Sequence, residues 1–317
     1  MKRSIKWCLL VVTICLAGCQ PPPEPLRIVS SPWAGYEPLY LARDLGYLKE
    51  TLVRITELPS SNINVEAFSN GSADLSTLTL DETLTLLAKG QKLRILLVMD
   101  ISNGADAVVA KPEIKSLAEL KGKRLAMENI PLGSYILSKV LEMSGLKAAD
   151  IEVIPMPEDK HEKAYSQGKI DAAITMEPYK SRITKAGAHV LLDSSQFPNE
   201  IFDIIVVRED VYQSRRDDLC NFAKQWFRTL DYVQANQKDA YARMSKRQGT
   251  NDEDFRTAMA SIKVPLRQEN QLFLGGNTPT LLAPARHLSD IMQRENMIPR
   301  PVDIAASIDT SFASCLQ

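Results

Sequence analysis

Two short stretches combine residue types that could hold a small organic molecule. Trp33 and Tyr36 offer flat apolar area with one polar atom each. Thr79 and Glu82 stand between an apolar run and the next amphipathic segment, where a hydroxyl and a carboxylate could bind polar groups of a ligand. Asp81 could serve in the same way, or could simply cap a helix by accepting its free N–H groups.

Catalytic and metal-binding patterns are missing from the sequence. His161, His189 and His287 are widely separated, without the spacing of a zinc site. The sequence has no Ser/His/Asp signature, no G-x-S-x-G elbow, and no nucleotide-binding glycine pattern. We therefore expect a binding protein with no catalytic residue, no metal and no cofactor.

Length and charge narrow the class further. The chain has 317 residues, enough for two lobes rather than one ordinary core. Its 38 basic and 39 acidic residues nearly cancel, and no basic stripe is present, so nucleic-acid binding is not expected. Nothing in the composition indicates an oligomer, and we expect a monomer.

The first 25 residues have the composition of an export and anchoring segment. Lys2, Arg3 and Lys6 precede an apolar stretch of about ten residues, the layout of a signal peptide. The stretch ends in Leu16-Ala17-Gly18-Cys19, which resembles the lipobox of bacterial lipoproteins. That resemblance implies a signal peptide at 1–18, acylation of Cys19, a Pro-rich tether at 19–25 and attachment to a lipid bilayer. The alternative is an ordinary signal peptide that happens to contain a cysteine.

Two further features bear on location. Gln20 after the modified cysteine resembles outer-membrane lipoproteins, although inner-membrane retention stays open. Among the remaining cysteines, Cys220 and Cys315 could form a disulfide in an oxidising compartment or stay reduced.

Short apolar runs alternate with amphipathic segments from residue 26 onward, which predicts βαβ units and parallel sheets. The predicted strands are Leu26–Val29, Leu52–Leu58, Asp74–Leu78, Leu93–Met99, Ala107–Ala110, Arg124–Met127, Ile151–Ile154, Ala172–Thr175 and Phe202–Val207. The predicted helices include Pro38–Leu45, Ile63–Phe68, Asp81–Ala88, Gly133–Met143, Lys160–Gln167, Tyr179–Ala186, Leu219–Ala235 and Leu281–Arg294.

Breaks in this alternation near residues 100–106 and 194–201 predict a second lobe inserted into the first. We expect lobe 1 at 26–103 and 200–317 and lobe 2 at 104–199, joined by a hinge with two crossings. A single doubly wound sheet with helical additions is the alternative.

Four stretches together resemble the periplasmic solute-binding proteins of ABC importers for sulfonates, taurine, nitrate and thiamine-pyrimidine precursors. They are residues 32–42 (PWAGYEPLYLA), 71–75 (GSADL), 116–123 (SLAELKGK) and 168–173 (GKIDAA). The resemblance implies a two-lobed α/β fold of the periplasmic-binding-protein type II class, with mostly parallel sheets flanked by helices. It also implies capture of a small molecule between the lobes for an ABC permease. A receptor that reports its ligand to a membrane sensor protein is the alternative, which Gln20 favours. A pyrimidine-forming enzyme shares this fold, but its cysteine cluster is absent here.

In this family the ligand lies against loops at the carboxyl ends of the strands, as in other open α/β sheets. A helix start at Gly133 could offer free N–H groups to an anion, or could be an ordinary helix start. Glu177 precedes Pro178 and is expected to face the cleft or the hinge, while Asp106 lies near the first crossing. The expected ligand-binding residues are Ser31, Trp33, Tyr36, Thr77, Thr79, Glu82, Asp106, Gly133, Ser134 and Glu177.

The ligand itself stays open between a pyrimidine-like and a sulfonate-like molecule. Sulfonate binders need hydroxyls, helix N-termini or arginine, whereas pyrimidine binders use aromatic walls and carboxylates. Trp33, Tyr36, Glu82, Asp106 and Glu177 favour an uncharged or cationic nitrogenous ligand.

Overall fold

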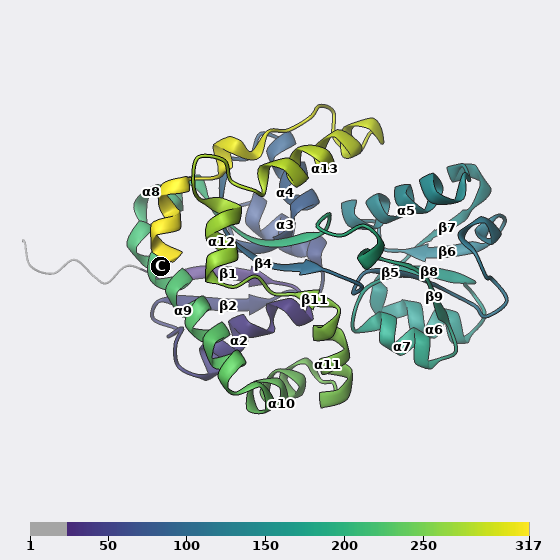
Figure 1. The fold of residues 1–317 in the computed structure, drawn as a ribbon, viewed down its shortest axis with the longest axis horizontal. Helices are drawn as coiled ribbons and strands as arrows, with labels where there is room; N and C mark the ends of the chain where they lie inside the picture. The colour runs from purple at the N-terminus through teal and green to yellow at the C-terminus, as the bar shows by residue number, and fades with distance from the viewer. Residues whose placement is uncertain (1–23, 317) are drawn as a thin grey trace, which may run out of the picture.

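The computed structural model describes residues 24–316 (Figure 1). The expected signal peptide, the acylated Cys19 and all but the end of the expected tether lie outside the described residues. No helix within the described part of the chain combines the length and the apolar character that crossing a membrane would require. Figure 1 shows two lobes of unequal size connected by a narrow waist.

The larger lobe, lobe 1, is built on a six-stranded sheet. Its strands, in spatial order, are β11 (Ile262–Lys263), β4 (Leu93–Ser102), β10 (Phe202–Arg208), β3 (Leu75–Thr79), β1 (Leu26–Ser30) and β2 (Val53–Glu57). Strands β1, β2 and β3 pair in parallel, whereas β10 runs antiparallel to both of its neighbours. The helices of this lobe are α2 (Glu37–Asp44), α3 (Ser61–Ser69), α4 (Leu80–Ala88), α8 (Glu209–Ser214), α9 (Arg216–Ala235), α10 (Gln237–Gln248), α11 (Asp252–Ala260), α12 (Arg267–Leu274) and α13 (Leu282–Arg294).

The smaller lobe, lobe 2, has a five-stranded sheet. Its order is β7 (Glu152–Pro155), β6 (Arg124–Met127), β8 (Ala172–Thr175), β5 (Ala107–Ala110) and β9 (His189–Asp193). The flanking helices are α5 (Pro131–Ser144), α6 (His161–Ser166) and α7 (Tyr179–Lys185).

The chain passes from β4 into β5 and returns from β9 into β10, and these two passages connect the lobes. Ser194 in the second passage hydrogen-bonds to the first passage. Its hydroxyl lies 2.7 Å from the Ser102 hydroxyl and accepts a hydrogen bond from the Gly104 N–H. The two-lobed fold class with a two-crossing hinge is therefore confirmed.

The prediction of parallel pairing is wrong for strands β5 and β10. Both strands run antiparallel to their neighbours. Each is the first strand that the chain enters after a passage between lobes, so it runs opposite to the strands formed by local βαβ units. The apolar runs do not indicate strand direction, because a buried strand has the same apolar composition in a parallel and in an antiparallel pair.

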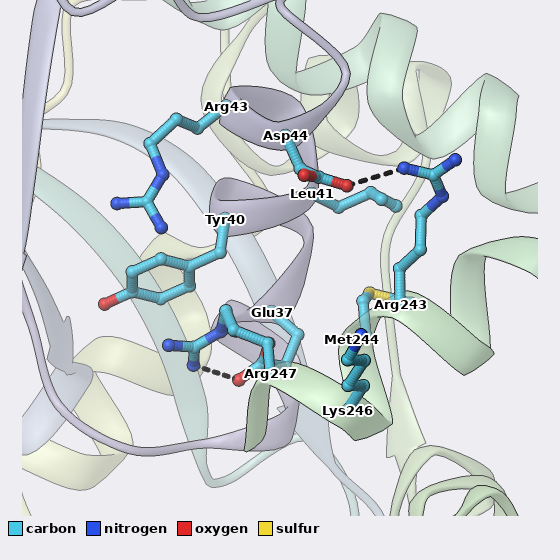
Figure 2. Close-up of a pocket in the computed structure, with 9 residues that line it drawn as sticks. All are labelled: Glu37, Tyr40, Leu41, Arg43, Asp44, Arg243, Met244, Lys246 and Arg247. Carbon is cyan, nitrogen blue, oxygen red and sulfur yellow. Dashed lines mark hydrogen bonds and ion pairs between the residues drawn. The ribbon is translucent and has the colours of Figure 1, made fainter. Parts of the chain in front are cut away.

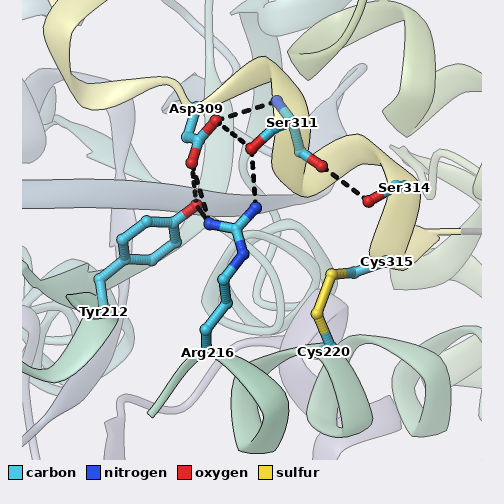
Figure 3. The surroundings of a disulfide bond; sticks show 7 residues. All are labelled: Tyr212, Arg216, Cys220, Asp309, Ser311, Ser314 and Cys315. Atoms are coloured by element: carbon cyan, nitrogen blue, oxygen red, sulfur yellow. Dashed lines mark hydrogen bonds and ion pairs between the residues drawn. A yellow bond between two sulfur atoms is a disulfide. The ribbon is translucent and has the colours of Figure 1, made fainter. Parts of the chain in front are cut away.

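A disulfide bond links the C-terminal segment to α9 (Figure 3). A disulfide joins Cys220 of α9 to Cys315 in the short helix η7 (Thr310–Leu316), so of the two alternatives the paired form holds. Beside it, the Asp309 carboxylate accepts hydrogen bonds from the Tyr212 hydroxyl at 2.7 Å and from the Arg216 guanidinium at 2.9 Å.

Candidate functional site

Two small cavities lie between the lobes. The first has a volume of about 30 Å³ and the second about 10 Å³. The first is lined by Ser31, Pro32, Trp33, Tyr36, Ser61, Thr79, Glu82, Asp106, Ile130, Leu132, Met176 and Asp203. The second is lined by Asp106, Glu128, Ile130, Leu132, Gly133, Ile136, Glu158, Ile174 and Thr175. The shared residues Asp106, Ile130 and Leu132 make the two cavities neighbours.

Lobe 1 contributes two aromatic side chains that are held by buried carboxylates. The Trp33 Nε1–H donates to Asp100 Oδ2 at 3.0 Å, and the Tyr36 hydroxyl donates to Asp203. Gly35 lies between the two aromatic residues, where a Cβ atom would lie only 1.9 Å from Asp100 Oδ2. A glycine is therefore required for this loop to approach the Asp100 carboxylate.

The start of α4 supplies the next wall. Thr79 and Glu82 form a reciprocal capping box, in which the Glu82 N–H donates to the Thr79 hydroxyl and the Thr79 N–H donates to Glu82 Oε2 at 3.0 Å. Ser61 at the start of α3 also donates to Glu82. Asp81 is 3% exposed, and its Oδ2 has no hydrogen-bond partner among the described residues.

Burial raises the pKa of the carboxyl groups in this region. It raises the pKa of Asp81 and of Asp100 to about 7 and that of Asp106 to about 6, because each charged form is removed from water. The same cause raises the pKa of Asp203 and of Glu158 well above the ordinary range. The cleft thus concentrates carboxyl groups whose charged form their own surroundings stabilise poorly.

Lobe 2 closes the site with the first turn of α5. Gly133 lies so close to the Glu128 carbonyl that a Cβ atom would be 2.6 Å from that oxygen. Glu158 is buried, and its Oε2 accepts a hydrogen bond from the Met176 N–H at 3.3 Å. Ile130 and Leu132 supply the apolar surface of this side.

Most of the expected ligand-binding residues come together at these cavities. The first cavity includes Ser31, Trp33, Tyr36, Thr79, Glu82 and Asp106, and the second includes Asp106 and Gly133. Thr77, Ser134 and Glu177 are not among the lining residues. A part in ligand binding stays a prediction for all ten residues.

Glu177 lies instead beside the hinge. Its N–H donates to the Ala105 carbonyl at 3.2 Å, and its Oε1 pairs with Lys180 at 3.2 Å. The Lys180 Nζ also donates to the Gly104 carbonyl at 2.7 Å. The carboxylate expected to face the cleft or the hinge thus contacts the group that holds the first crossing.

Asp100, Asp203, Glu128 and Glu158 were not among the predicted site residues. A signal for two of them existed, since Asp100 and Asp203 each interrupt a run of apolar residues within a strand. A carboxylate within such a run is rarely buried without a purpose or a partner. Glu128 and Glu158 lie in loops and short turns, where a carboxylate is unremarkable in the sequence alone.

The cavities are too small for an organic ligand in the described arrangement, since binding pockets measure hundreds of cubic ångströms. The lobes must separate to admit one. Helices α4 and α5 contact each other across the cleft, and Lys185 of α7 pairs with Asp254 of α11. These contacts belong to the closed arrangement.

A separate pocket of about 480 Å³ lies on lobe 1, between α2 and α10 (Figure 2). The Arg247 guanidinium donates to buried Glu37 and lies over the Tyr40 ring at 3.6 Å. Arg243 pairs with Asp44 at 2.7 Å. Much of the charge in this pocket is thus neutralised by ion pairs within lobe 1.

Among residues 24–316, no cluster of three or more His, Cys, Asp or Glu side chains is arranged to hold a metal ion. The buried carboxylates line a cavity without converging on one point.

Comparison with known proteins adds relatives and structural neighbours. The taurine-binding periplasmic protein of Escherichia coli K12 is 26% identical over 163 residues, which is 50% of this chain and 51% of that protein. The putative aliphatic sulfonates-binding protein of the same organism is 27% identical over 198 residues, covering 59% and 60% of the two chains. The alignments therefore span only about half to three fifths of these curated relatives.

Structural similarity extends much further along the chain. The alkanesulfonate-binding protein SsuA from Xanthomonas axonopodis pv. citri, solved with bound MOPS, superposes with a TM-score of 0.77. The superposition covers 92% of this chain and 99% of that one at 18% identity, so it establishes a shared fold. Residues 33–240 match the family model described as NMT1/THI5 like, and the chain belongs to this family.

Proposed function

We propose that the chain is a lipid-anchored extracytoplasmic solute-binding protein that captures a small organic molecule between its lobes for an ABC-type importer. The observation that carries this proposal is the first cavity, whose walls come from both lobes: Trp33 and Glu82 from one, Ile130 and Leu132 from the other. A molecule that contacts both walls stabilises the closed arrangement over the open one.

The relatives support this class of function. Two of them are named for binding taurine and aliphatic sulfonates in the periplasm, and both are similar to this chain over at least half its length. From those names and from the sequence, the ligand would be a sulfonate-like or a pyrimidine-like molecule. Capture rather than catalysis is proposed, with the monomer as the working unit.

Export and anchoring are supported by two features. The lipobox-like Leu16-Ala17-Gly18-Cys19 follows an apolar segment, and a disulfide joins Cys220 to Cys315. Disulfides are typical of oxidising compartments such as the periplasm. Replacement Cys19→Ala should move the protein from the membrane fraction to the soluble fraction or leave it unprocessed. Normal membrane anchoring of that variant would refute the lipid anchor.

A ligand-sensing lipoprotein is the second candidate, and Gln20 favours it. This residue resembles the sorting position of outer-membrane lipoproteins, whereas an importer's receptor works at the inner membrane. Separation of inner and outer membranes on a density gradient distinguishes the two: co-sedimentation with the inner membrane supports delivery to a permease.

Native mass spectrometry tests solute capture itself. Protein purified without denaturation and incubated with a small-molecule extract of cells should carry a non-covalent mass that is lost on denaturation. The bare chain mass under every condition would contradict the proposed function.

A further inference from the structure

The charged side chains on the walls of the interlobe cavities all have the same sign. Glu82, Asp106 and Asp203 line the first cavity, and Glu128 and Glu158 join Asp106 in the second. No Lys, Arg or His of the described chain lines either cavity. A sulfonate needs the opposite arrangement, with cationic or N–H donors around its oxygens.

Lys180 is a cation that acts on Asp106, and it already has partners. Lys180 is 3.2 Å from Glu177 Oε1, and its Nζ donates to the Gly104 carbonyl at 2.7 Å. Its charge therefore offsets Glu177 and favours the ionised form of Asp106, but a single positive charge does not balance the five acids on the cavity walls.

The helix start beside the first cavity already uses one of its donors within lobe 1. The first N–H groups of α4 are the donors that an anion would use. In this chain the Glu82 N–H donates to the Thr79 hydroxyl, and the Glu82 carboxylate accepts from the Thr79 N–H at 3.0 Å. The protein thus places the Glu82 carboxylate at the start of α4, where it would repel a sulfonate.

Buried polar atoms provide a second, independent indication. The Thr175 side chain lines the second cavity, is 1% exposed, and its hydroxyl has no partner among the described residues. Asp81 Oδ2 and Asp100 Oδ1, both buried in lobe 1, also lack partners there. Because unsatisfied buried polar atoms cost free energy, a ligand group that hydrogen-bonds to the Thr175 hydroxyl would stabilise the site, whereas Asp81 and Asp100 line neither cavity.

We infer that the ligand is an organic cation, a protonated amine or amidinium on a small apolar body, and this inference rests on the proposed function. Trp33 and Tyr36 line the first cavity and suit a cation, since aromatic faces attract positive charge. Ile130 and Leu132 line both cavities and match the apolar body.

Once the lobes have separated, the walls of the second cavity also offer carboxylates to a second amino group. One ammonium group beside Glu82 and Asp203 would leave the apolar body at Ile130 and Leu132, pointing toward the second cavity. Glu128 and Glu158 lie on the walls of that cavity. Diamines should therefore bind more tightly than monoamines of the same length.

The electrostatic state of the cleft agrees with this ligand. Burial raises the pKa of Asp106 to about 6 and raises that of Glu158 and Asp203 well above the ordinary range. A bound cation stabilises the ionised carboxylates, so its binding releases protons and tightens as the pH rises.

Calorimetric titration with a charge-sorted library tests the inference. The library should contain amines and amidines, neutral alcohols, and sulfonates on matched carbon skeletons, for example 1,4-diaminobutane, butylamine, 1-butanol and butane-1-sulfonate. At pH 8 we expect binding only among the cations. Asp106→Asn and Glu158→Gln should each weaken that binding at least tenfold, and the control Asp290→Asn, exposed on α13, should not change it.

The outcomes separate this inference from the function on which it rests. Binding confined to sulfonates or neutral molecules would overturn the cation and leave solute capture standing. Cation binding that survives both acid-to-amide variants would place the cation elsewhere and also overturn the inference. Absence of binding in every class would contradict solute capture itself. Both variants keep the shape of the side chain, and circular dichroism should verify that they fold.

Discussion

Replacement of Asp106 by asparagine should stabilise the ligand-free protein at alkaline pH. The side chain is 3% exposed, and burial raises its pKa to about 6 from an ordinary value of 3.8. Below pH 3.8 the group is protonated in both the folded and the unfolded chain, so it contributes nothing. Between pH 3.8 and 6 the folded chain binds more protons, and the free energy of unfolding therefore falls as the pH rises.

The size of the effect follows from the two pKa values. Above pH 6 the buried charge costs about 3 kcal/mol, and at pH 4 it costs about 0.5 kcal/mol. The ionised group is surrounded by other charges: Lys180, Glu177, Glu158, Asp81, Asp100 and Asp203. Asparagine removes the charge and keeps the shape, so the variant should gain up to about 3 kcal/mol at pH 8.

Urea unfolding at pH 4 and pH 8 measures this difference. Asp290→Asn is the matched control, because it removes the same charge from an exposed position on α13 and should change stability little at either pH. The reasoning is refuted if Asp106→Asn gains no more at pH 8 than at pH 4, or if the control gains as much.

Two further predictions concern the links that hold the structure together. Cys315→Ala should lower the free energy of unfolding by about 2–4 kcal/mol, because the disulfide closes a loop with a sequence separation of 95 residues. Wild-type protein with the disulfide reduced should have the same stability as the variant. An unchanged urea midpoint would contradict this prediction. Lys185→Ala should weaken ligand binding by up to about fivefold, because the exposed pair with Asp254 spans the two lobes and such pairs contribute about 0.2–1 kcal/mol. Lys89→Ala, exposed within lobe 1, is the control for calorimetric titration, and equal effects of both variants would refute a role in closure.

Much of the fold could be predicted because each element has a local signal. The strands at Ala107–Ala110, Arg124–Met127 and Ala172–Thr175 begin and end where the apolar runs do. Asn251 is the N-cap of α11, as its position before three acidic residues indicates. The directions of β5 and β10 could not be predicted in this way, because pairing direction depends on how the chain passes between lobes.

Only part of the candidate site could be predicted from the sequence. Trp33 and Tyr36 follow strand β1, and Glu82 lies in the first turn of α4 after strand β3, where the general rule for α/β sheets places ligands. Asp100 and Asp203 lie within strands, and their hydrogen bonds to Trp33 and Tyr36 join residues 67 and 167 positions apart. Such long-range pairing has no periodic signature, so the acidic character of the whole cleft emerged only from the structure.

The central claim is that the lobes open to admit a ligand and close around it, and a distance measured between the lobes tests it most directly. Spin labels on the variant Glu66→Cys, Glu142→Cys would report on lobe 1 through α3 and on lobe 2 through α5, and both positions are exposed in the wild type. Without ligand, double electron–electron resonance should show a population at long distance. With the tightest-binding amine of the library at saturation, that population should disappear into a single shorter distance. One distance that ligand leaves unchanged would contradict closure around a bound molecule.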